Sequence, residues 1–231
     1  RRAVQYATYN AGPREVYLIE EPMAAALGAR LPIQDAVPNV IVDIGGGTTE
    51  VAVISMGGLI SSRSLRIAGD KLTEDTIRYL REERNLLIGD ATGENVKVSL
   101  GSAWALDEEI ELPVRGRDLL SGLPREIMVT SQEIRQAMHR SIKSIVRAVK
   151  NAIEETPPEL TADLLNRPIA LAGGGALIRG IDTMIAKETK LLVQPVDDPL
   201  TAVVRGCGMV LENLEQLRPV LLSQTEDEYR S

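Results

Sequence analysis

The sequence predicts an α/β fold, in which strands and helices pack as layers. Strand-like apolar runs and helix-like periodic segments alternate along much of the chain, as they do in layered α/β domains. Two apolar runs end in a glycine triplet, at residues 45–47 and 173–175. Bare backbone at the end of a strand lets N–H groups approach phosphate or sugar oxygens. We therefore expect one nucleotide to be held between two glycine-rich loops.

The composition narrows the functional classes. Hydrophobic residues make up 44% of the 231 residues, which is enough for a substantial core. The formal net charge of -7 and the absence of Phe argue against a nucleic-acid binder, which needs a basic surface and stacking aromatics. Cys207 and His139 are alone of their types, so neither a disulfide nor a histidine metal cluster is expected. Both residues fit structural rather than chemical roles. His139 fits a solvated surface position, and Cys207 lies in a small-residue stretch suited to close helix packing.

The first third of the chain predicts a meander that follows two helices. Residues 1–11 have the character of a helix end, and Pro22 suits the first turn of a helix through Leu27. The predicted strands cover residues 16–19, 39–44, 49–54 and 59–67. The second strand is rich in Val and Ile, as a buried strand is, and the third alternates as an antiparallel partner does.

Helices dominate the middle of the chain. Residues 70–87 predict a helix, and residues 88–130 predict a small insertion with strands at 110–114 and 126–129. Thr130 and Glu133 form a capping box, which predicts a helix to about Glu155 with one apolar face.

The last third predicts two more strands and two more helices. A strand at 168–172 leads into the second glycine triplet, and a helix follows through Met184. Residues 191–193 predict a short strand. Asp198 and Pro199 offer an N-cap and a first-turn proline for a final helix to about Leu217.

Asp43 ends the predicted buried strand directly before the first glycine triplet. A carboxylate there can hold Mg²⁺, directly or through water, beside a phosphate. Gly45, Gly46 and Gly47 supply backbone amides without side-chain hindrance, and Thr48 can add a hydroxyl. A plain hairpin turn is the alternative, because glycines are common in turns.

Glu21 and the pair Glu94 and Lys97 are further candidates. Glu21 complements the dipole of a predicted helix; across a cleft from Thr48, it could also orient a water for attack on a γ-phosphate. Glu94 and Lys97 would share a helix face, one accepting from ribose hydroxyls and one near the base. A solvated ion pair is the alternative, and Gly93 with the apolar alternation after it leaves a strand open.

Together these motifs resemble a known superfamily. Residues 43–50 resemble the second phosphate motif of the actin, sugar kinase and heat-shock chaperone ATPases, residues 172–175 their adenosine motif, and residues 21–26 the helix between their lobes. Within it, the chain resembles the MreB family of bacterial actin-like, rod shape-determining proteins. The runs that carry this resemblance are 17–28, 42–54, 116–125, 156–160 and 199–211.

The resemblance implies an actin-like ATPase fold of the ribonuclease H-like type. Residues 1–57 would form the C-terminal part of an incomplete lobe I. Residues 58–217 would form a complete lobe II with a small α+β insertion at about 90–130, and 218–231 a polar tail. Nothing in the chain matches the superfamily's first phosphate loop or the family's membrane-entering loop, so we expect a piece of a longer protein.

The resemblance also implies roles for the candidate residues. Glu21 would polarise the attacking water, which Thr48 helps to place, and Asp43 would serve Mg²⁺. Gly45, Gly46 and Gly47 would hold the β- and γ-phosphates. The segment meeting ribose and adenine would be Glu94, Asn95, Val96 and Lys97. The segment closing over adenosine would be Gly173, Gly174, Gly175 and Ala176.

The implied function is that of a bacterial actin-like cytoskeletal ATPase. It would bind ATP with Mg²⁺, polymerise into membrane-associated filaments and determine rod cell shape by organising cell-wall synthesis. Its partners would be further copies, cell-shape and wall-synthesis membrane proteins and the inner membrane surface, in the cytoplasm at the inner face of the cell membrane. Alone, the chain should hydrolyse ATP weakly or not at all. The alternatives are a sugar-kinase-like or chaperone-like ATPase, or a polymer subunit without turnover.

Overall fold

A five-stranded mixed sheet lies at the centre of the structure, a computed structural model that describes residues 2–222. The strand order is β3-β2-β1-β7-β8. The strands are β1 (Asn39–Ile44), β2 (Thr49–Ser55), β3 (Gly58–Leu65), β7 (Ile169–Ala172) and β8 (Val193–Pro195). The first three form an antiparallel meander, whereas β7 and β8 add in parallel on the other edge of β1.

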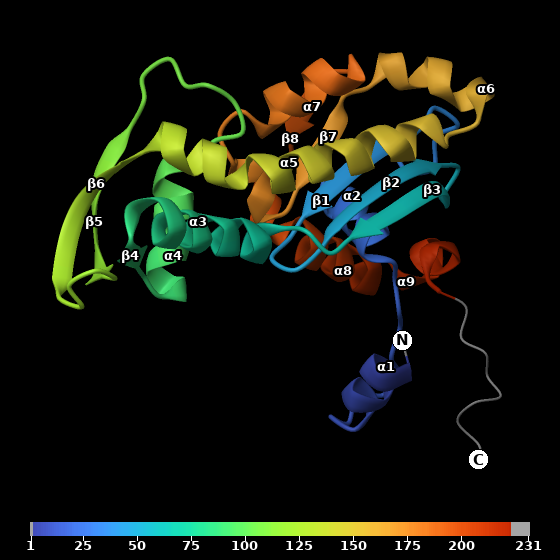
Figure 1. Cartoon of the computed structure of the whole chain (residues 1–231). Helices are drawn as coiled ribbons and strands as arrows, with labels where there is room; N and C mark the ends of the chain where they lie inside the picture. Colours follow the sequence, from blue (N-terminus) through green and yellow to red (C-terminus); the bar gives the residue numbers. More distant parts are fainter. Residues whose placement is uncertain (1, 223–231) are drawn as a thin grey trace.

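The alternation of side chains along β1 divides the core into two layers. Val40, Val42 and Ile44 belong to one buried cluster, whereas Ile41 belongs to the other. The first cluster includes α3 (Gly69–Arg84), α4 (Asp90–Leu100), α5 (Ser131–Glu154) and α7 (Ile181–Thr189). The second includes α2 (Glu21–Gly28) and α8 (Ala202–Glu212). The sheet is therefore covered by helices on both faces, and β1 is buried throughout (Figure 1).

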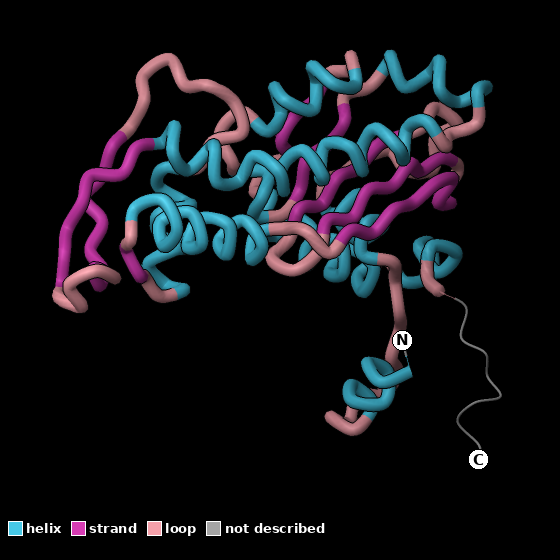
Figure 2. The backbone as a smooth tube through the Cα atoms, viewed as in Figure 1, coloured by secondary structure: helices cyan, strands magenta, loops and turns pink. Residues whose placement is uncertain are grey.

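A second, three-stranded sheet lies at the N-terminal end of α5, away from the five-stranded sheet (Figure 2). Its strands are β4 (Leu86–Leu87), β5 (Glu111–Asp118) and β6 (Pro124–Thr130). The predicted capping box joins this sheet to α5: the Glu133 amide donates to the Thr130 hydroxyl at 3.3 Å, and the Thr130 amide donates to the Glu133 carboxylate at 2.9 Å. This confirms the predicted start of the long helix.

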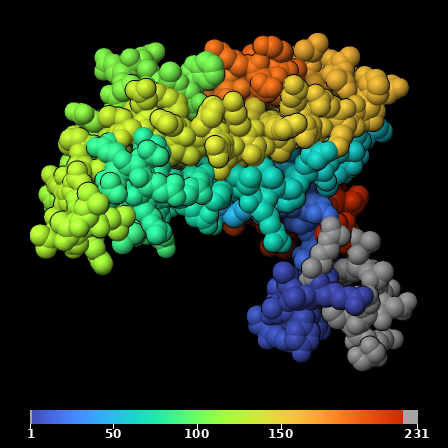
Figure 3. All heavy atoms as spheres, viewed as in Figure 1, coloured from blue at the N-terminus to red at the C-terminus, as the bar shows by residue number. Residues whose placement is uncertain are grey.

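The remaining elements are short. They are α1 (Arg2–Tyr9), α6 (Pro158–Thr161), α9 (Leu214–Leu217) and the 3₁₀ turns η1 (Ala162–Asn166), η2 (Gly174–Leu177), η3 (Pro199–Thr201) and η4 (Arg218–Val220). The α1 helix buries none of its residues and projects from the body (Figure 3). Within residues 2–222, no helix is both long and apolar enough to cross a membrane.

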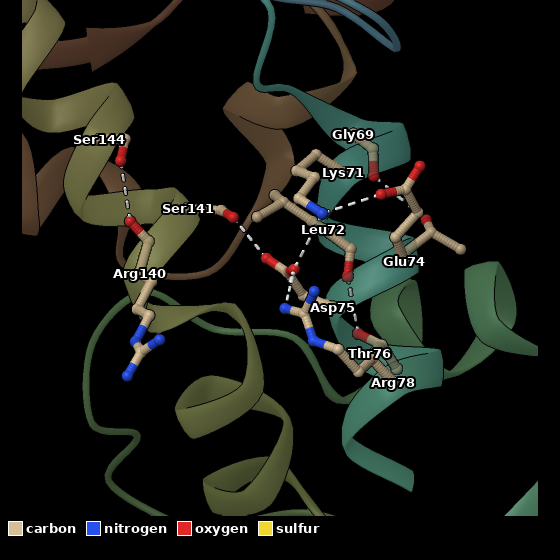
Figure 4. A network of polar contacts seen from close by, with 11 residues as sticks. Gly69, Lys71, Leu72, Glu74, Asp75, Thr76, Arg78, Arg140, Ser141 and Ser144 are labelled. Carbon is tan, nitrogen blue, oxygen red and sulfur yellow. Dashed lines mark hydrogen bonds and ion pairs between the residues drawn. The ribbon is translucent and has the colours of Figure 1, made fainter. Parts of the chain in front are cut away.

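A buried carboxylate fastens α3 to α5. Asp75 of α3 is 2% exposed, and its carboxylate accepts a hydrogen bond from the Ser141 hydroxyl of α5 (Figure 4). Arg78 and Lys71 of α3 lie 2.5 and 3.5 Å from the same carboxylate. A buried charge is tolerated only with such partners. The network therefore orients α3, whose N-terminus reaches the sheet edge described below.

Three predicted boundaries are wrong, each for a local reason. The predicted strand at 16–19 is only an isolated bridge between Ile19 and Leu221. The final helix starts at Ala202, because Asp198 has a left-handed backbone (φ 46°) and makes no N-cap, and it breaks at Asn213. The helix predicted over 70–87 ends at Arg84, since the next two leucines pair as β4 with β5.

One observation concerns the predicted lobe boundary, which stays a prediction. A division between residues 57 and 58 falls in the turn between β2 and β3, which pair within one sheet. Residues 39–57 therefore belong to the same sheet as β3, and α2 packs on that sheet as well. The predicted tail is described only to residue 222, so its segment 223–231 lies outside the described residues.

Two glycines allow α2 and α8 to touch backbone to backbone. A Cβ on Gly206 would overlap the Ala24 carbonyl of α2, and one on Gly28 would overlap the Ala202 carbonyl of α8. The close helix packing predicted around Cys207 is therefore confirmed, whereas Gly208 has open space around it.

We predict that Gly206→Ala destabilises the chain by about 1–3 kcal/mol, because α2 and α8 must move apart to admit a methyl group. Gly208→Ala is the matched control in the same helix. It should leave the free energy of unfolding unchanged or raise it by up to about 1 kcal/mol, since alanine favours helix over glycine. Urea unfolding of both variants measures the difference. Equal stability of the two variants would contradict the packing described.

Candidate functional site

The parallel register of β1 and β7 brings the two glycine triplets to the same edge of the sheet. Asp43 lies opposite Ala172, so the glycine triplets that follow the two strands begin side by side, offset by one residue. Gly173 has a positive φ of 77°, and a Cβ there would overlap the Asp43 carboxylate. A Cβ on Gly175 would overlap the Ile44 side chain. The second triplet thus packs against the end of β1 in a way that only glycine permits at these two positions.

A cavity of about 620 Å³ opens at this edge, a volume typical of small-molecule sites. The residues that line it are Glu21, Asp43, Gly45, Gly46, Gly69, Asp70, Glu94, Lys97, Val98, Gly101, Gly173, Gly174, Gly175, Leu177, Ile178, Pro199, Leu200 and Val203. The cavity therefore brings together residues of both triplets, Asp43, Glu21 and the pair Glu94 and Lys97.

Five of the candidate residues do not line this cavity. Thr48 and Gly47 lie beyond it in the first glycine loop, where the Thr48 carbonyl accepts the Gly45 amide at 2.9 Å. Ala176 is buried in the core. Asn95 and Val96 line a separate hollow between α4 and β5. Because residues 94–97 are helical, only the two ends of that segment reach the cavity.

The first glycine loop is held by the N-terminus of α3. The Gly69 amide donates to the Gly45 carbonyl at 3.0 Å, and the Asp70 amide donates to the Gly46 carbonyl at 2.8 Å. The Lys97 ammonium donates to the Gly69 carbonyl at 3.1 Å. Within residues 2–222, the amides of Gly46 and Gly47 donate to no protein acceptor. These two donors are therefore available to an anion.

Gly69, Asp70 and the apolar lining of the cavity are not among the residues that the sequence motifs predict. Gly69 and Asp70 carried a weak signal, a Gly-Asp pair that opens a helix after a meander. Such a pair lies beside a phosphate loop only if that loop folds back onto the helix. Val98, Leu177 and Leu200 carried none, since apolar residues near a loop or helix end are common.

Glu94 is held in its ionised form. Its carboxylate lies 2.6 Å from the Lys97 ammonium and accepts the Thr73 hydroxyl at 2.5 Å. Burial alone would raise the pKa of Glu94, but the hydrogen bonds from Lys97 and Thr73 outweigh it, so the pKa lies below its usual value. Gly93 has a packing role: a Cβ there would lie 2.5 Å from Ile77 of α3. This explains why the helix α4 contains a glycine.

Asp43 is the most unusual group in the cavity. It is 3% exposed, and within the described residues its Oδ2 atom has no hydrogen-bond partner. Burial, followed by repulsion from Glu21 and Glu50, raises the pKa of Asp43 to about 6. An unpaired buried carboxylate is costly, so this group lacks a cationic or donor partner that a ligand can bring.

The charges of the lining fit a divalent cation bound together with an anion. Four carboxylates face one lysine, and within residues 2–222 no cluster of three or more metal-ligating side chains could hold a metal alone. Mg²⁺ commonly uses one or two carboxylates and completes its shell with water and substrate phosphates. Asp43 therefore fits a magnesium ligand of this kind.

We predict that Asp43 makes the ligand-free chain less stable as the pH rises from about 4 to 6. Its pKa is about 6 in the folded chain against 3.8 ordinarily, so the folded state holds the extra proton in this range. At about 1.4 kcal/mol per pKa unit, the loss reaches up to about 3 kcal/mol. Urea unfolding across this range measures it.

The Asp43→Asn variant should lose this part of the pH dependence, because an amide does not titrate. The exposed Asp107→Asn variant is the control and should keep it. A pH dependence that is the same in Asp43→Asn and wild type would show that Asp43 titrates normally.

Comparison with known proteins gives close relatives. The MreB/Mbl protein family matches residues 1–219. The cell shape-determining protein MreB of Escherichia coli (strain K12) is 49% identical over 215 residues, which cover 93% of this chain and 62% of that protein. The cell shape-determining protein Mbl of Bacillus subtilis (strain 168) is 42% identical over 217 residues, covering 94% and 65%. The chain thus spans less than two thirds of the length of these relatives.

Solved structures share the fold. MreB5 of Spiroplasma citri, in crystal structures bound to ADP and to AMPPNP, superposes with a TM-score of 0.90 at 36% identity. The match covers 95% of this chain and 67% and 66% of those chains. A MamK double helical filament matches with a TM-score of 0.75 at 21% identity, covering 91% of this chain and 64% of that one, and supports the fold alone. The predicted actin-like α/β fold is confirmed, and the chain belongs to the MreB/Mbl protein family.

Proposed function

We propose that the chain is part of a bacterial actin-like cytoskeletal ATPase and binds ATP with Mg²⁺ in the cavity at the sheet edge. The observation that carries this proposal is the convergence of two glycine loops on one buried, unpartnered carboxylate, Asp43. Nucleotide-bound MreB5 supports it, since that protein holds ADP or AMPPNP on the same fold.

The two ends of the cavity suit the two ends of a nucleotide. The free amides of Gly46 and Gly47 lie at the phosphate end, and Asp43 there would hold Mg²⁺, which offsets the charge between the phosphates and the acidic lining. Gly173 packs beside Asp43, and from there the second triplet continues into a lining that includes the apolar side chains of Leu177, Leu200 and Val203. That apolar surface suits a purine base, and Glu94 and Lys97 suit the ribose between the two ends.

Glu21 is our candidate for the residue that orients the attacking water. It is exposed at the N-terminus of α2, lines the cavity and raises the pKa of Asp43 by repulsion, which places its charge near the phosphate end. Thr48, in the first glycine loop just beyond the lining, would assist it. A carboxylate and a hydroxyl placed beside a γ-phosphate can position water for in-line attack.

We further propose that the complete protein assembles into filaments with its own copies at the inner face of the cell membrane. There it would determine rod shape with cell-shape and wall-synthesis membrane proteins. The names of the relatives, cell shape-determining proteins, support the shape-determining role. Binding of ATP would favour the filament, and hydrolysis would weaken it by removing γ-phosphate contacts.

We predict that Gly46→Val weakens the binding of Mg·ADP by at least about tenfold while the chain stays folded. The three atoms nearest to a Cβ at Gly46 all belong to the Asp70 carboxylate, the nearest at an ordinary 3.4 Å, so the first side-chain atom meets no backbone and the valine would occupy the space of a phosphate. Isothermal titration of the whole chain measures this. Gly208→Val is the control, because that glycine is far from the lining and has open space. Equal affinity of both variants for Mg·ADP would show that no phosphate binds at this loop.

We predict that Glu21→Ala, in the full-length protein, slows ATP hydrolysis about 100-fold or more and leaves the Kd for ATP within about threefold. The reason is that Glu21 would act on the water rather than on the nucleotide. Single-turnover phosphate release and nucleotide titration separate the two quantities. A parallel loss of binding and hydrolysis would assign Glu21 to binding instead.

A further inference from the structure

Arg179 connects two walls of the cavity that are far apart in sequence. One wall is the C-terminal turn of α4, which contributes Val98 and Gly101 to the lining. The other is the segment after the second glycine triplet, which contributes Leu177 and Ile178. Arg179 follows directly after this second segment and lies outside the lining itself, so its effect on the cavity is indirect.

The guanidinium group of Arg179 caps α4. Its Nη1 atom lies 3.4 Å from the Val98 carbonyl, 3.0 Å from the Ser99 carbonyl and 3.4 Å from the Gly101 carbonyl. The last carbonyls of a helix have no partners within the helix, and a cation there also opposes the helix dipole. The arginine thus supplies donors that the C-terminus of α4 lacks.

The backbone of Arg179 makes a second link to the same place. Its carbonyl accepts the Ala103 amide at 2.7 Å, and Arg179 forms a parallel bridge with Ser102. Immediately after it, Gly180 is so close to Trp104 that a Cβ would lie 2.6 Å from the Trp104 Cβ. The segment after the second glycine triplet, which we call the adenosine loop, is therefore bound to the C-terminus of α4 by both main-chain and side-chain contacts.

We propose that Arg179 is a positioning residue for the nucleotide: it sets the distance between α4 and the adenosine loop, and thereby the width of the cavity at its adenosine end. This inference rests on the proposed function, because it assigns that end to adenosine. The first glycine loop at the phosphate end is held by the backbone amides of Gly69 and Asp70, and α4 contributes there through the Lys97 side chain. Loss of the Arg179 link therefore affects one end of the ligand and spares the other.

The test compares two probes on the whole chain, Mg·ADP and magnesium tripolyphosphate, for wild type, Arg179→Ala and Arg179→Lys. In Arg179→Ala the affinity for Mg·ADP falls about 10- to 100-fold, the size of effect that misplacement by about 1 Å produces, while the affinity for tripolyphosphate changes less than about twofold. Arg179→Lys recovers only part of the loss, because the lysine side chain is one bond shorter and does not bring its ammonium to the position of the Nη1 atom. The exposed Arg147→Ala, on α5, is the control and behaves as wild type.

Hydrogen exchange adds a readout that needs no ligand. The Gly101 amide closes the last turn of α4 on the Lys97 carbonyl at 2.8 Å, so it exchanges faster in Arg179→Ala than in Arg147→Ala. Unchanged exchange at Gly101, or unchanged affinity for Mg·ADP, overturns the inference. Equal losses for both probes together with a lower Tm also overturn it, since they show a general structural role. Wild-type chain that binds tripolyphosphate but not Mg·ADP instead overturns the adenosine assignment on which the inference rests.

Discussion

The pairing of β1 with β7 is the constraint on which the rest of the site depends. Its parallel register sets Asp43 opposite Ala172, so both glycine triplets leave the sheet at one edge. The contact is so close that residues 173 and 175 must lack a Cβ. A shift of the register by one residue would turn Asp43 toward the opposite helical layer and separate the loops. Thus the sheet, rather than either loop, builds the cavity.

The same register explains why an uncompensated charge persists in the core. Asp43 is buried between β2 and β7, and repulsion from Glu21 and Glu50 adds to the cost. Strain of this kind is retained where a ligand relieves it. The surrounding elements are held firmly: Asp75 joins α3 to α5, and Gly28 and Gly206 join α2 to α8. The site therefore combines a rigid frame with one group that needs a partner.

Local signals in the sequence predicted the main strands and helices well, whereas the features that they missed depend on tertiary contacts. The β1 strand and the capping box at Thr130 follow from residue types next to each other, so their predicted positions are confirmed. The alternation after Gly93 left a strand open, because the packing of Gly93 on Ile77 involves a distant part of the chain. Asp198 misled because its residue type does not indicate its left-handed backbone. The approach of Gly69 and Leu200 to the cavity also depends on how loops fold back.

The most direct test of this account is a crystal structure of the chain with Mg²⁺ and AMPPNP. We expect the phosphates within hydrogen-bond distance of the Gly46 and Gly47 amides, Mg²⁺ beside Asp43, and adenosine against residues 173–178. The nucleotide would then span both triplets. Density for the nucleotide outside the cavity, or phosphates at the second triplet and the base at the first, would contradict the central claim that the paired strands β1 and β7 present one nucleotide with two glycine loops.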